Sequence, residues 1–188
     1  MNQKLHVNDD SFSGSLDTAD RVGECSRQGA LGSNHARSVV LRPWRVDVPT
    51  EIAPELLAAY QTAEYWVSGA PESFCLRVGQ YSAPLAQLLQ ETNCRCAAFV
   101  SAHNPLSEPS PARANHKAHE RLRQALVPQT TCLIEGAGRD AAGQWPDERS
   151  FLAVGLGLDA SKIVGEQFGQ NAIVWAGSDA IPRLILLR

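Results

Sequence analysis

An unbroken apolar run that ends abruptly in a polar turn most constrains how this chain can fold. Residues 96–100 read Cys-Ala-Ala-Phe-Val, with no alternation of polar residues, which is typical of a strand covered on both faces. The next five residues, Ser-Ala-His-Asn-Pro at 101–105, end in a strong turn dipeptide. Loops at the ends of such strands often carry functional side chains, so the first candidate site is placed here.

The charge balance argues against two broad classes of partner. The chain has 17 Lys and Arg against 20 Asp and Glu, a net charge of −3. It therefore has no general attraction to phosphate backbones or anionic lipids, and we expect neither nucleic acid nor a membrane as a partner. No window approaches the roughly 18 apolar residues that a membrane span needs, and the first residues lack the apolar segment of a signal peptide.

The cysteines are odd in number, and three of them lie within apolar, strand-like runs. They are Cys25, Cys75, Cys94, Cys96 and Cys132. This pattern favours reduced thiols in a hydrophobic core rather than a disulfide framework, and hence a cytoplasmic protein.

The composition divides the chain into an arm and one domain. Residues 1–40 are rich in Asp, Ser and Gly, with apolar residues scattered singly, a composition typical of a disordered segment. Acidic and basic residues balance there, so the arm is not a basic nucleic-acid tail. With 44% hydrophobic residues in the chain, residues 41–188 suffice for a single packed domain.

Hydrophobic spacing predicts the elements of this domain. We expect helices over 50–62, 82–89, 111–126 and 159–168. Strands are expected over 96–100, 131–135, 150–156, 172–176 and 183–187, with a hairpin over 65–78 and a short strand or packed lead-in over 38–48. The predicted N-caps are Thr50, Ser82, Ser110 and Asp159, Gly169 ends the last helix, and 136–149 form a long turn-rich connection. This order predicts an α+β fold with a mixed, mostly antiparallel sheet and layered helices.

Three short sequence motifs follow one another along the chain. They are Ser-Ala-His-Asn-Pro at 101–105, Trp145 with Glu-Arg-Ser-Phe at 148–151, and Phe-Gly-Gln-Asn-Ala at 168–172. Over about residues 53–175 the chain resembles the bacterial domain of unknown function family 3293 (DUF3293). The resemblance marks Asn104, Pro105, Asn115, Trp145, Glu148, Phe168, Gly169, Gln170, Asn171 and Ala172. It implies no activity.

Most of the marked polar residues are amides. Asn104, Asn115, Gln170 and Asn171 can donate and accept hydrogen bonds but do not titrate, so they suit recognition of a polar ligand rather than proton transfer. The alternative is that they cap turns and helix ends. Of Gln170 and Asn171, Gln170 is the stronger ligand candidate, because glutamine is a poor turn former. Phe168 and Gly169 are expected to be structural.

For proton transfer the candidates are Glu148, Glu135, Asp147 and His103. Glu148 stands near Trp145 at a strand entry, where apolar shielding would raise the pKa of a carboxyl as a general acid requires. The alternative is an exposed hairpin glutamate. Asp147 directly precedes Glu148, so the sequence does not decide which carboxylate matters.

Two further patterns suggest weaker possibilities. His116 and His119 are one helical turn apart, but neither they with His103 nor the Cys94-x-Cys96 pair completes a known ligand set, so no metal or other cofactor is expected. The helix 111–126 is basic on its exposed side, through Arg113, Lys117, Arg121 and Arg123, which suits an acidic partner or a solvated face.

The sequence thus leads to three functional hypotheses. The first is a small polar or anionic ligand bound by Asn104, Asn115, Trp145, Glu148, Gln170 and Asn171. The second is a small hydrolase-type enzyme that uses Glu148 as acid or base, and the third is a protein-interaction module that uses helix 111–126. Whether the protein is an enzyme stays open.

Overall fold

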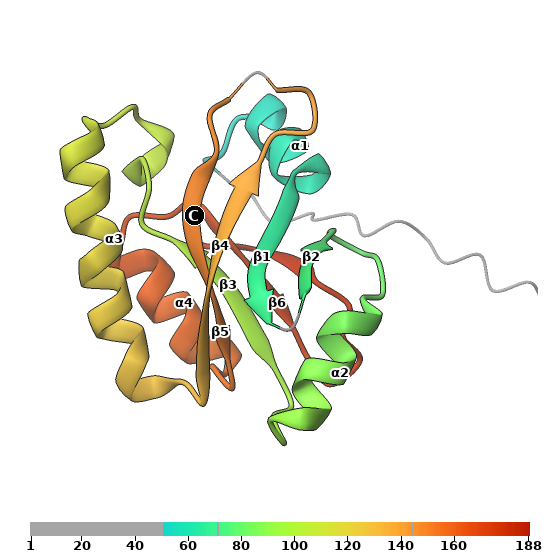
Figure 1. Cartoon of the computed structure of the whole chain (residues 1–188). Helices are drawn as coiled ribbons and strands as arrows, with labels where there is room; N and C mark the ends of the chain where they lie inside the picture. The colour runs from blue at the N-terminus through green and yellow to red at the C-terminus, as the bar shows by residue number, and fades with distance from the viewer. Residues whose placement is uncertain (1–50, 71, 144) are drawn as a thin grey trace, which may run out of the picture. The chain divides into compact units, whose positions relative to one another are not determined.

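The computed structural model describes residues 51–70, 72–143 and 145–188, which form one antiparallel sheet with helices on both of its faces (Figure 1). The predicted disordered arm at 1–40, the lead-in at 38–48 and the cap Thr50 lie outside the described residues. The boundary proposed at residue 41 does so as well.

Seven strands make up the sheet in this part of the chain. They are β1 (Glu64–Ala70), β2 (Glu72–Leu76), β3 (Ala97–Ser101), β4 (Cys132–Arg139), β5 (Glu148–Val154), β6 (Ala172–Ala176) and β7 (Arg183–Leu186). Their order is β2-β1-β4-β5-β3-β6-β7, and every described pairing is antiparallel. The predicted α+β fold is confirmed, including the hairpin formed by β1 and β2.

The helices cover the two faces of the sheet and create two cores. On one face α2 (Ala83–Glu91) packs its leucines against β1, β2 and the central strands. On the other face α3 (Ala112–Leu126) and α4 (Leu158–Gln167) pack against β3, β5 and β6, and they lie side by side in Figure 1. A fourth helix among the described residues, α1 (Pro54–Thr62), precedes β1, and two 3-10 turns, η1 (Pro105–Ser107) and η2 (Val127–Gln129), flank α3.

The strand predicted from the apolar run is buried on both faces, as expected. In β3, Ala97 and Phe99 point into the core beneath α2, whereas Ala98 and Val100 point into the core beneath α3 and α4. Because alternate residues of a strand face opposite sides, this strand requires an apolar residue at every position. The segment 101–105 follows directly, and its Ala102 is still buried in the core beneath α3 and α4.

Three of the predicted helix starts are wrong. The first helix begins only at Pro54, which suits a first helical residue because its φ is fixed, and Ala53 takes the N-cap position. Ser110 does not cap α3, because its hydroxyl bonds the Glu108 carbonyl instead. Gly157, not Asp159, is the N-cap of α4.

The predicted Ser82 cap is confirmed, since its Oγ accepts a hydrogen bond from the Leu85 N–H at 3.3 Å.

The connection predicted over 136–149 links two strands of a hairpin, as expected, but its predicted bounds are wrong, because β4 and β5 extend into it from both sides. Gly136 was taken as a turn residue, but it pairs with Val67 and Ser150 within the sheet. A Cβ at this position would lie 2.6 Å from the Trp66 carbonyl oxygen and 2.7 Å from the Phe99 ring. The glycine is therefore explained by close packing rather than by a turn.

The four described cysteines are free thiols and are only partly buried, so the prediction of core positions was too strong. Cys25 lies outside the described residues. Among the helices that the structure describes, none is both long enough and apolar enough to cross a membrane.

Candidate functional site

The turn that follows β3 is held in an uncommon backbone conformation. Asn104 has φ 43°, Leu106 has φ 60° and Ser107 has φ 59°, so three residues with side chains are left-handed. This conformation costs roughly 1–2 kcal/mol for a residue with a Cβ, although asparagine is enriched there. A strained turn persists only where surrounding contacts hold it.

Asn104 and Asn115 form the amide pair that holds this turn. Asn115 is buried on α3; its Oδ1 accepts from the Asn104 backbone N–H (3.0 Å), and its Nδ2 donates to Asn104 Oδ1 (2.9 Å). Asn104 Oδ1 also accepts from the Ser110 N–H at 3.0 Å. Asn115 Nδ2 lies 3.2 Å from the Ser110 carbonyl oxygen and 3.1 Å from Nε2 of His103. Both amides are thus engaged within the protein, which agrees with the alternative that these side chains stabilise turns and helix ends.

Glu148 is the titratable group next to this amide pair. It is the first residue of β5, and its Oε1 accepts a hydrogen bond from Asn104 Nδ2 at 3.2 Å. Gly138 of β4 lies opposite both Tyr65 of β1 and Glu148 of β5. Because directly opposed residues share a face, Tyr65 and Glu148 flank a position without a side chain. Among the described residues, a Cβ at Gly138 would meet only the Glu148 carbonyl oxygen, at 4.0 Å.

Burial determines the acid–base properties of this position. It raises the pKa of Glu148, and the hydrogen bond from Asn104 opposes that rise. The pKa of Tyr65 is raised as well, first by burial and then by its proximity to Tyr60 and Glu148. A carboxyl with a raised pKa keeps its proton to a higher pH than an exposed glutamate and is better placed to exchange it.

Asn171 also holds this turn, through one of its left-handed residues. It is buried, and its Nδ2 donates to the Tyr60 hydroxyl (3.2 Å) and to Ser107 Oγ (3.0 Å). The Tyr60 and Ser107 hydroxyls also bond each other. Asn171 therefore connects α1, the left-handed turn and the start of β6.

Gly169 and Gln170 contact the turn through its backbone. Gly169 ends α4 with φ 66°, as predicted, and its carbonyl accepts from the Leu106 N–H at 2.7 Å. Gln170 Nε2 lies 3.2 Å from the His103 carbonyl and 3.3 Å from the Phe168 carbonyl. The structure thus brings Gln170, Asn171, Asn104, Asn115 and Glu148 together around residues 103–107.

Trp145 and Asp147 lie apart from this cluster of contacts. Trp145 is 53% exposed in the connection before β5. Glu148 is therefore partly buried although the tryptophan near it in the sequence is exposed. Asp147 pairs with Arg139 at 2.9 Å, and both side chains are about half exposed. Of the two adjacent carboxylates, Glu148 is the one that is partly buried, and burial raises its pKa.

Residues 100–173 match the family model described as "Protein of unknown function (DUF3293)". The chain contains a DUF3293 domain. The match lies within the wider stretch over which the resemblance was drawn, and it includes the left-handed turn, Asn115, Glu148, Gln170 and Asn171. No curated protein and no solved structure matches the chain.

The DUF3293 domain also contains a buried histidine, His119, whose burial was not predicted from the sequence. His119 is 2% exposed, stacks on Phe151 with ring centroids 4.2 Å apart, and lies 3.1 Å from Glu135 through Nε2. Arg123 and Arg149 contact the same carboxylate at 3.4 and 3.3 Å. Burial, followed by the charge of Arg149, lowers the pKa of His119 despite the opposing effect of Glu135.

A helical stripe in the sequence could have identified this histidine. The buried residues of α3 are Asn115, His119, Leu122 and Leu126, which recur every three or four residues as one face of a helix does. His116 is exposed, so the two histidines of the suggested pair point in different directions. No three His, Cys, Asp or Glu side chains of the described residues gather as metal ligands would.

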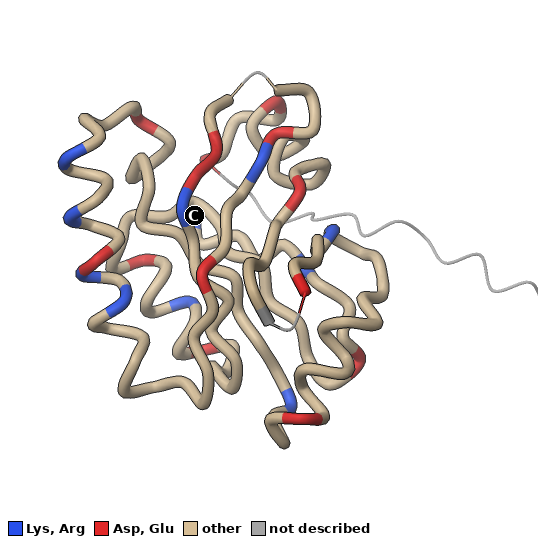
Figure 2. Tube along the Cα trace, viewed as in Figure 1, with Lys and Arg blue, Asp and Glu red and all other residues tan. Residues whose placement is uncertain are grey.

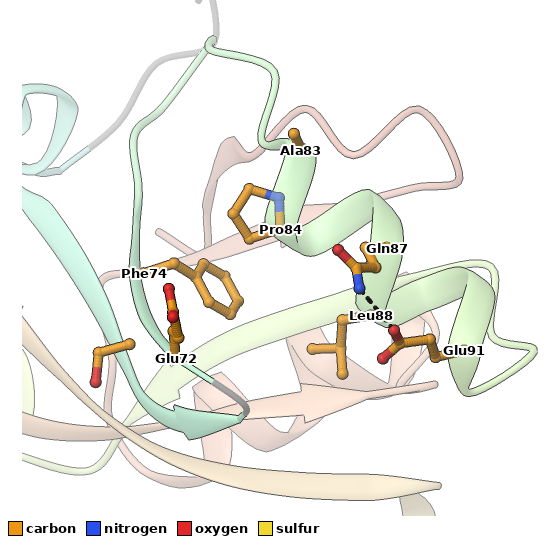
Figure 3. Close-up of a pocket in the computed structure, with 8 residues that line it drawn as sticks. Glu72, Phe74, Ala83, Pro84, Gln87, Leu88 and Glu91 are labelled. Carbon is orange, nitrogen blue, oxygen red and sulfur yellow. Dashed lines mark hydrogen bonds between the residues drawn. The ribbon is translucent and has the colours of Figure 1, made fainter.

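An open groove of about 440 Å³ lies between β2 and α2, outside the matched residues (Figure 3). Its lining residues are Glu72, Ser73, Phe74, Ala83, Pro84, Gln87, Leu88 and Glu91. No predicted site residue lines it. Its polar side chains are exposed, and Gln87 bonds Glu91 one turn along the same helix at 2.7 Å. Functional sites more often combine shielded polar groups from several elements, which favours the turn around Asn104.

The basic residues predicted on helix 111–126 lie along α3 (Figure 2). Two of them are engaged within the domain. Arg121 lies over the Phe168 ring, 6.0 Å from its centroid, and Arg123 contacts Glu135. The helix therefore presents a less uniform positive surface than its sequence suggests.

Proposed function

We propose that the DUF3293 domain binds a small polar ligand that donates a hydrogen bond to Glu148. The observation that carries this proposal is the contact between Asn104 Nδ2 and Glu148 Oε1, because a strained turn here holds a partly buried carboxylate. Asn104 and Asn115 then act by positioning Glu148 and the turn rather than by enclosing the ligand themselves. A carboxylate acceptor favours a neutral or cationic donor over the anionic ligand that the sequence left open.

A titration with two three-carbon probes tests this proposal. Propionamide can donate to Glu148, whereas propionate is acceptor-only when ionised and is repelled. In the full chain, propionamide should shift the NMR signal of the Asn104 side-chain amide, and propionate should not. The shift should be lost in Glu148→Ala, which removes the acceptor, and kept in Glu72→Ala, a matched change at an exposed strand glutamate. A response that persists in Glu148→Ala would refute the proposal.

A second candidate is general acid–base catalysis by Glu148, as in a small hydrolase, and the raised pKa of its carboxyl supports it. Turnover of a bound compound that falls by about 100-fold or more in Glu148→Gln, with binding retained, would favour this enzyme function. The interaction module based on α3 has weaker support, since Arg121 and Arg123 already have partners within the domain. The cytoplasmic location remains a prediction from the sequence.

A further inference from the structure

The orientation of the Asn115 amide can be assigned from its contacts. Its Oδ1 faces the backbone N–H of Asn104 at 3.0 Å, and a backbone N–H can only donate. The atom facing it is therefore the oxygen, and the nitrogen must occupy the Nδ2 position. The same nitrogen faces Asn104 Oδ1 at 2.9 Å and the Ser110 carbonyl at 3.2 Å, two further acceptors that agree with this orientation.

This orientation determines where His103 carries its proton. Asn115 Nδ2 lies 3.1 Å from His103 Nε2, and an amide nitrogen donates but does not accept. Asn115 Nδ2 has two hydrogens for three acceptors, so His103 Nε2 shares one of them with Asn104 Oδ1 or the Ser110 carbonyl. A hydrogen on His103 Nε2 would face this donor and find no acceptor, so Nε2 is the unprotonated ring nitrogen. A neutral imidazole with a bare Nε2 carries its hydrogen on Nδ1. Burial, and then the neighbouring His119, lower the pKa of His103, which keeps the ring neutral near pH 7.

His119 has the opposite tautomer. Its Nε2 faces a carboxylate oxygen of Glu135, so Nε2 carries the hydrogen and Nδ1 is bare in the neutral ring. His119 Nδ1 is buried and has no hydrogen-bond partner among the described residues. His119 Nδ1 therefore has no hydrogen to donate to a ligand. Of the two imidazoles, His103 is the one with a free N–H donor, at Nδ1. Within the part of the chain that the structure describes, no hydrogen bond engages His103 Nδ1.

His103 and Glu148 are each one hydrogen bond away from the Asn104–Asn115 pair. Glu148 accepts from Asn104, and His103 accepts from Asn115. His103 and Asn104 are also consecutive residues of the same strained turn, and both side chains are only partly buried. The Asn104–Asn115 pair thus connects a donor on the turn, His103 Nδ1–H, with an acceptor at the start of β5, the Glu148 carboxylate.

We propose that His103 is the second ligand-contacting group of the Glu148 site and that the site recognises a primary carboxamide, whose oxygen accepts from His103 Nδ1–H while its N–H donates to Glu148. This inference rests on the proposed function, since it adds a donor to the acceptor already assigned there. Asn115 is a positioning residue in this arrangement, because it fixes the tautomer of His103 without touching the ligand.

The tautomer is tested first, in the full chain without ligand. Two-bond correlations between imidazole protons and nitrogens in ¹⁵N-labelled protein distinguish a protonated from a bare ring nitrogen, and His103→Gln identifies the His103 signals. At pH 7 His103 should be protonated at Nδ1, whereas His119 should be protonated at Nε2. Asn115→Asp places a carboxylate acceptor beside His103 Nε2, so it should move the proton to Nε2 and raise the pKa of His103. Protonation of wild-type His103 at Nε2 would overturn the inference.

Ligand recognition is tested with propionamide and N,N-dimethylpropionamide, which keeps the acceptor oxygen but has no N–H. Propionamide should shift the His103 Nδ1 signal and bind at least about tenfold more tightly than the dimethyl compound, the effect of one hydrogen bond to a charged group. His103→Gln should weaken propionamide binding, and the exposed control His116→Gln should not. Binding that is lost in Glu148→Ala but unchanged in His103→Gln refutes the role of His103 and leaves the proposed function standing. Binding unchanged in both variants, or no response of the wild type, refutes both proposals.

Discussion

Asn104 donates a hydrogen bond to Glu148 over 3.2 Å, which joins the strained turn after β3 to the first residue of β5. The two residues are 44 positions apart in the sequence, and β3 and β5 are neighbours in the sheet. The contact has two consequences. The hydrogen bond lowers the pKa that burial alone would give Glu148. It also comes from an asparagine, a residue type that tolerates the left-handed backbone conformation better than most others do.

We expect Asn104→Ala and Asn104→Gly to differ in stability although both remove the same side chain. Both lose the bonds to Ser110, Asn115 and Glu148, but only alanine suffers in the left-handed conformation. Asn104→Ala should lower the free energy of unfolding by about 1–2 kcal/mol more than Asn104→Gly. Urea unfolding of the two variants measures this difference. Equal losses would show that residue 104 does not keep its positive φ.

Replacement of Glu148 should stabilise the domain at neutral pH. The folded pKa of Glu148 is raised above the ordinary glutamate value, so between the unfolded and the folded pKa the native state binds more protons than the unfolded state. The stability contributed by the protonated carboxyl is therefore fully present below the unfolded pKa, near 4.3, and is lost as the pH rises through the folded pKa.

Glu148→Gln keeps an acceptor for Asn104 and removes the buried charge. It should raise the free energy of unfolding at pH 7 relative to the wild type and have little effect near pH 4. Stability curves from pH 4 to pH 8 check this, with Glu72→Gln as the exposed control. A loss of stability at pH 7 on Glu148→Gln, with no loss on Glu72→Gln, would contradict the assigned direction of the pKa shift.

The elements of the fold were predictable because they depend on local periodicity. The apolar run in β3 and the stripes of the helices are properties of neighbouring residues, and they survived in the structure. Helix starts were less predictable, since Ser110 found a competing partner in the Glu108 carbonyl. Gly136 was misread because the contacts that require a glycine come from Trp66 and Phe99, which are distant in sequence.

The candidate site was predictable in its membership but not in its roles. Residue type and the family resemblance marked Asn104, Asn115 and Glu148, yet type alone could not show that the amides hold one another. The tautomer of His103 depends on an amide 12 residues away and on a backbone N–H that orients that amide. Such relationships exist only once β3 and α3 are packed together.

Gly169 should tolerate no side chain, in contrast to Gly157. Gly169 has φ 66°, and a Cβ there would lie 3.0 Å from the Pro105 Cβ, so Gly169→Ala should lower the free energy of unfolding by about 1–2 kcal/mol for the backbone alone. Gly157 has φ −65° and open space around a Cβ, so Gly157→Ala should change stability by no more than about 0.5 kcal/mol. Thermal unfolding separates the two glycines, and similar Tm values for the two variants would show that the end of α4 is not constrained as described.

Gln170 and Phe168 should separate binding from stability. Phe168 is 8% exposed in the core beneath α3 and α4, so Phe168→Ala should cost about 3–5 kcal/mol. Gln170 is only partly buried and donates to the His103 and Phe168 carbonyls, contacts whose loss costs about 1 kcal/mol. Gln170→Ala should therefore shift the Tm by only a few degrees, but it should weaken propionamide binding because it releases the His103 backbone. Calorimetry and the propionamide titration on both variants check this, and a Gln170→Ala variant that unfolds as readily as Phe168→Ala would place Gln170 in the scaffold instead of the site.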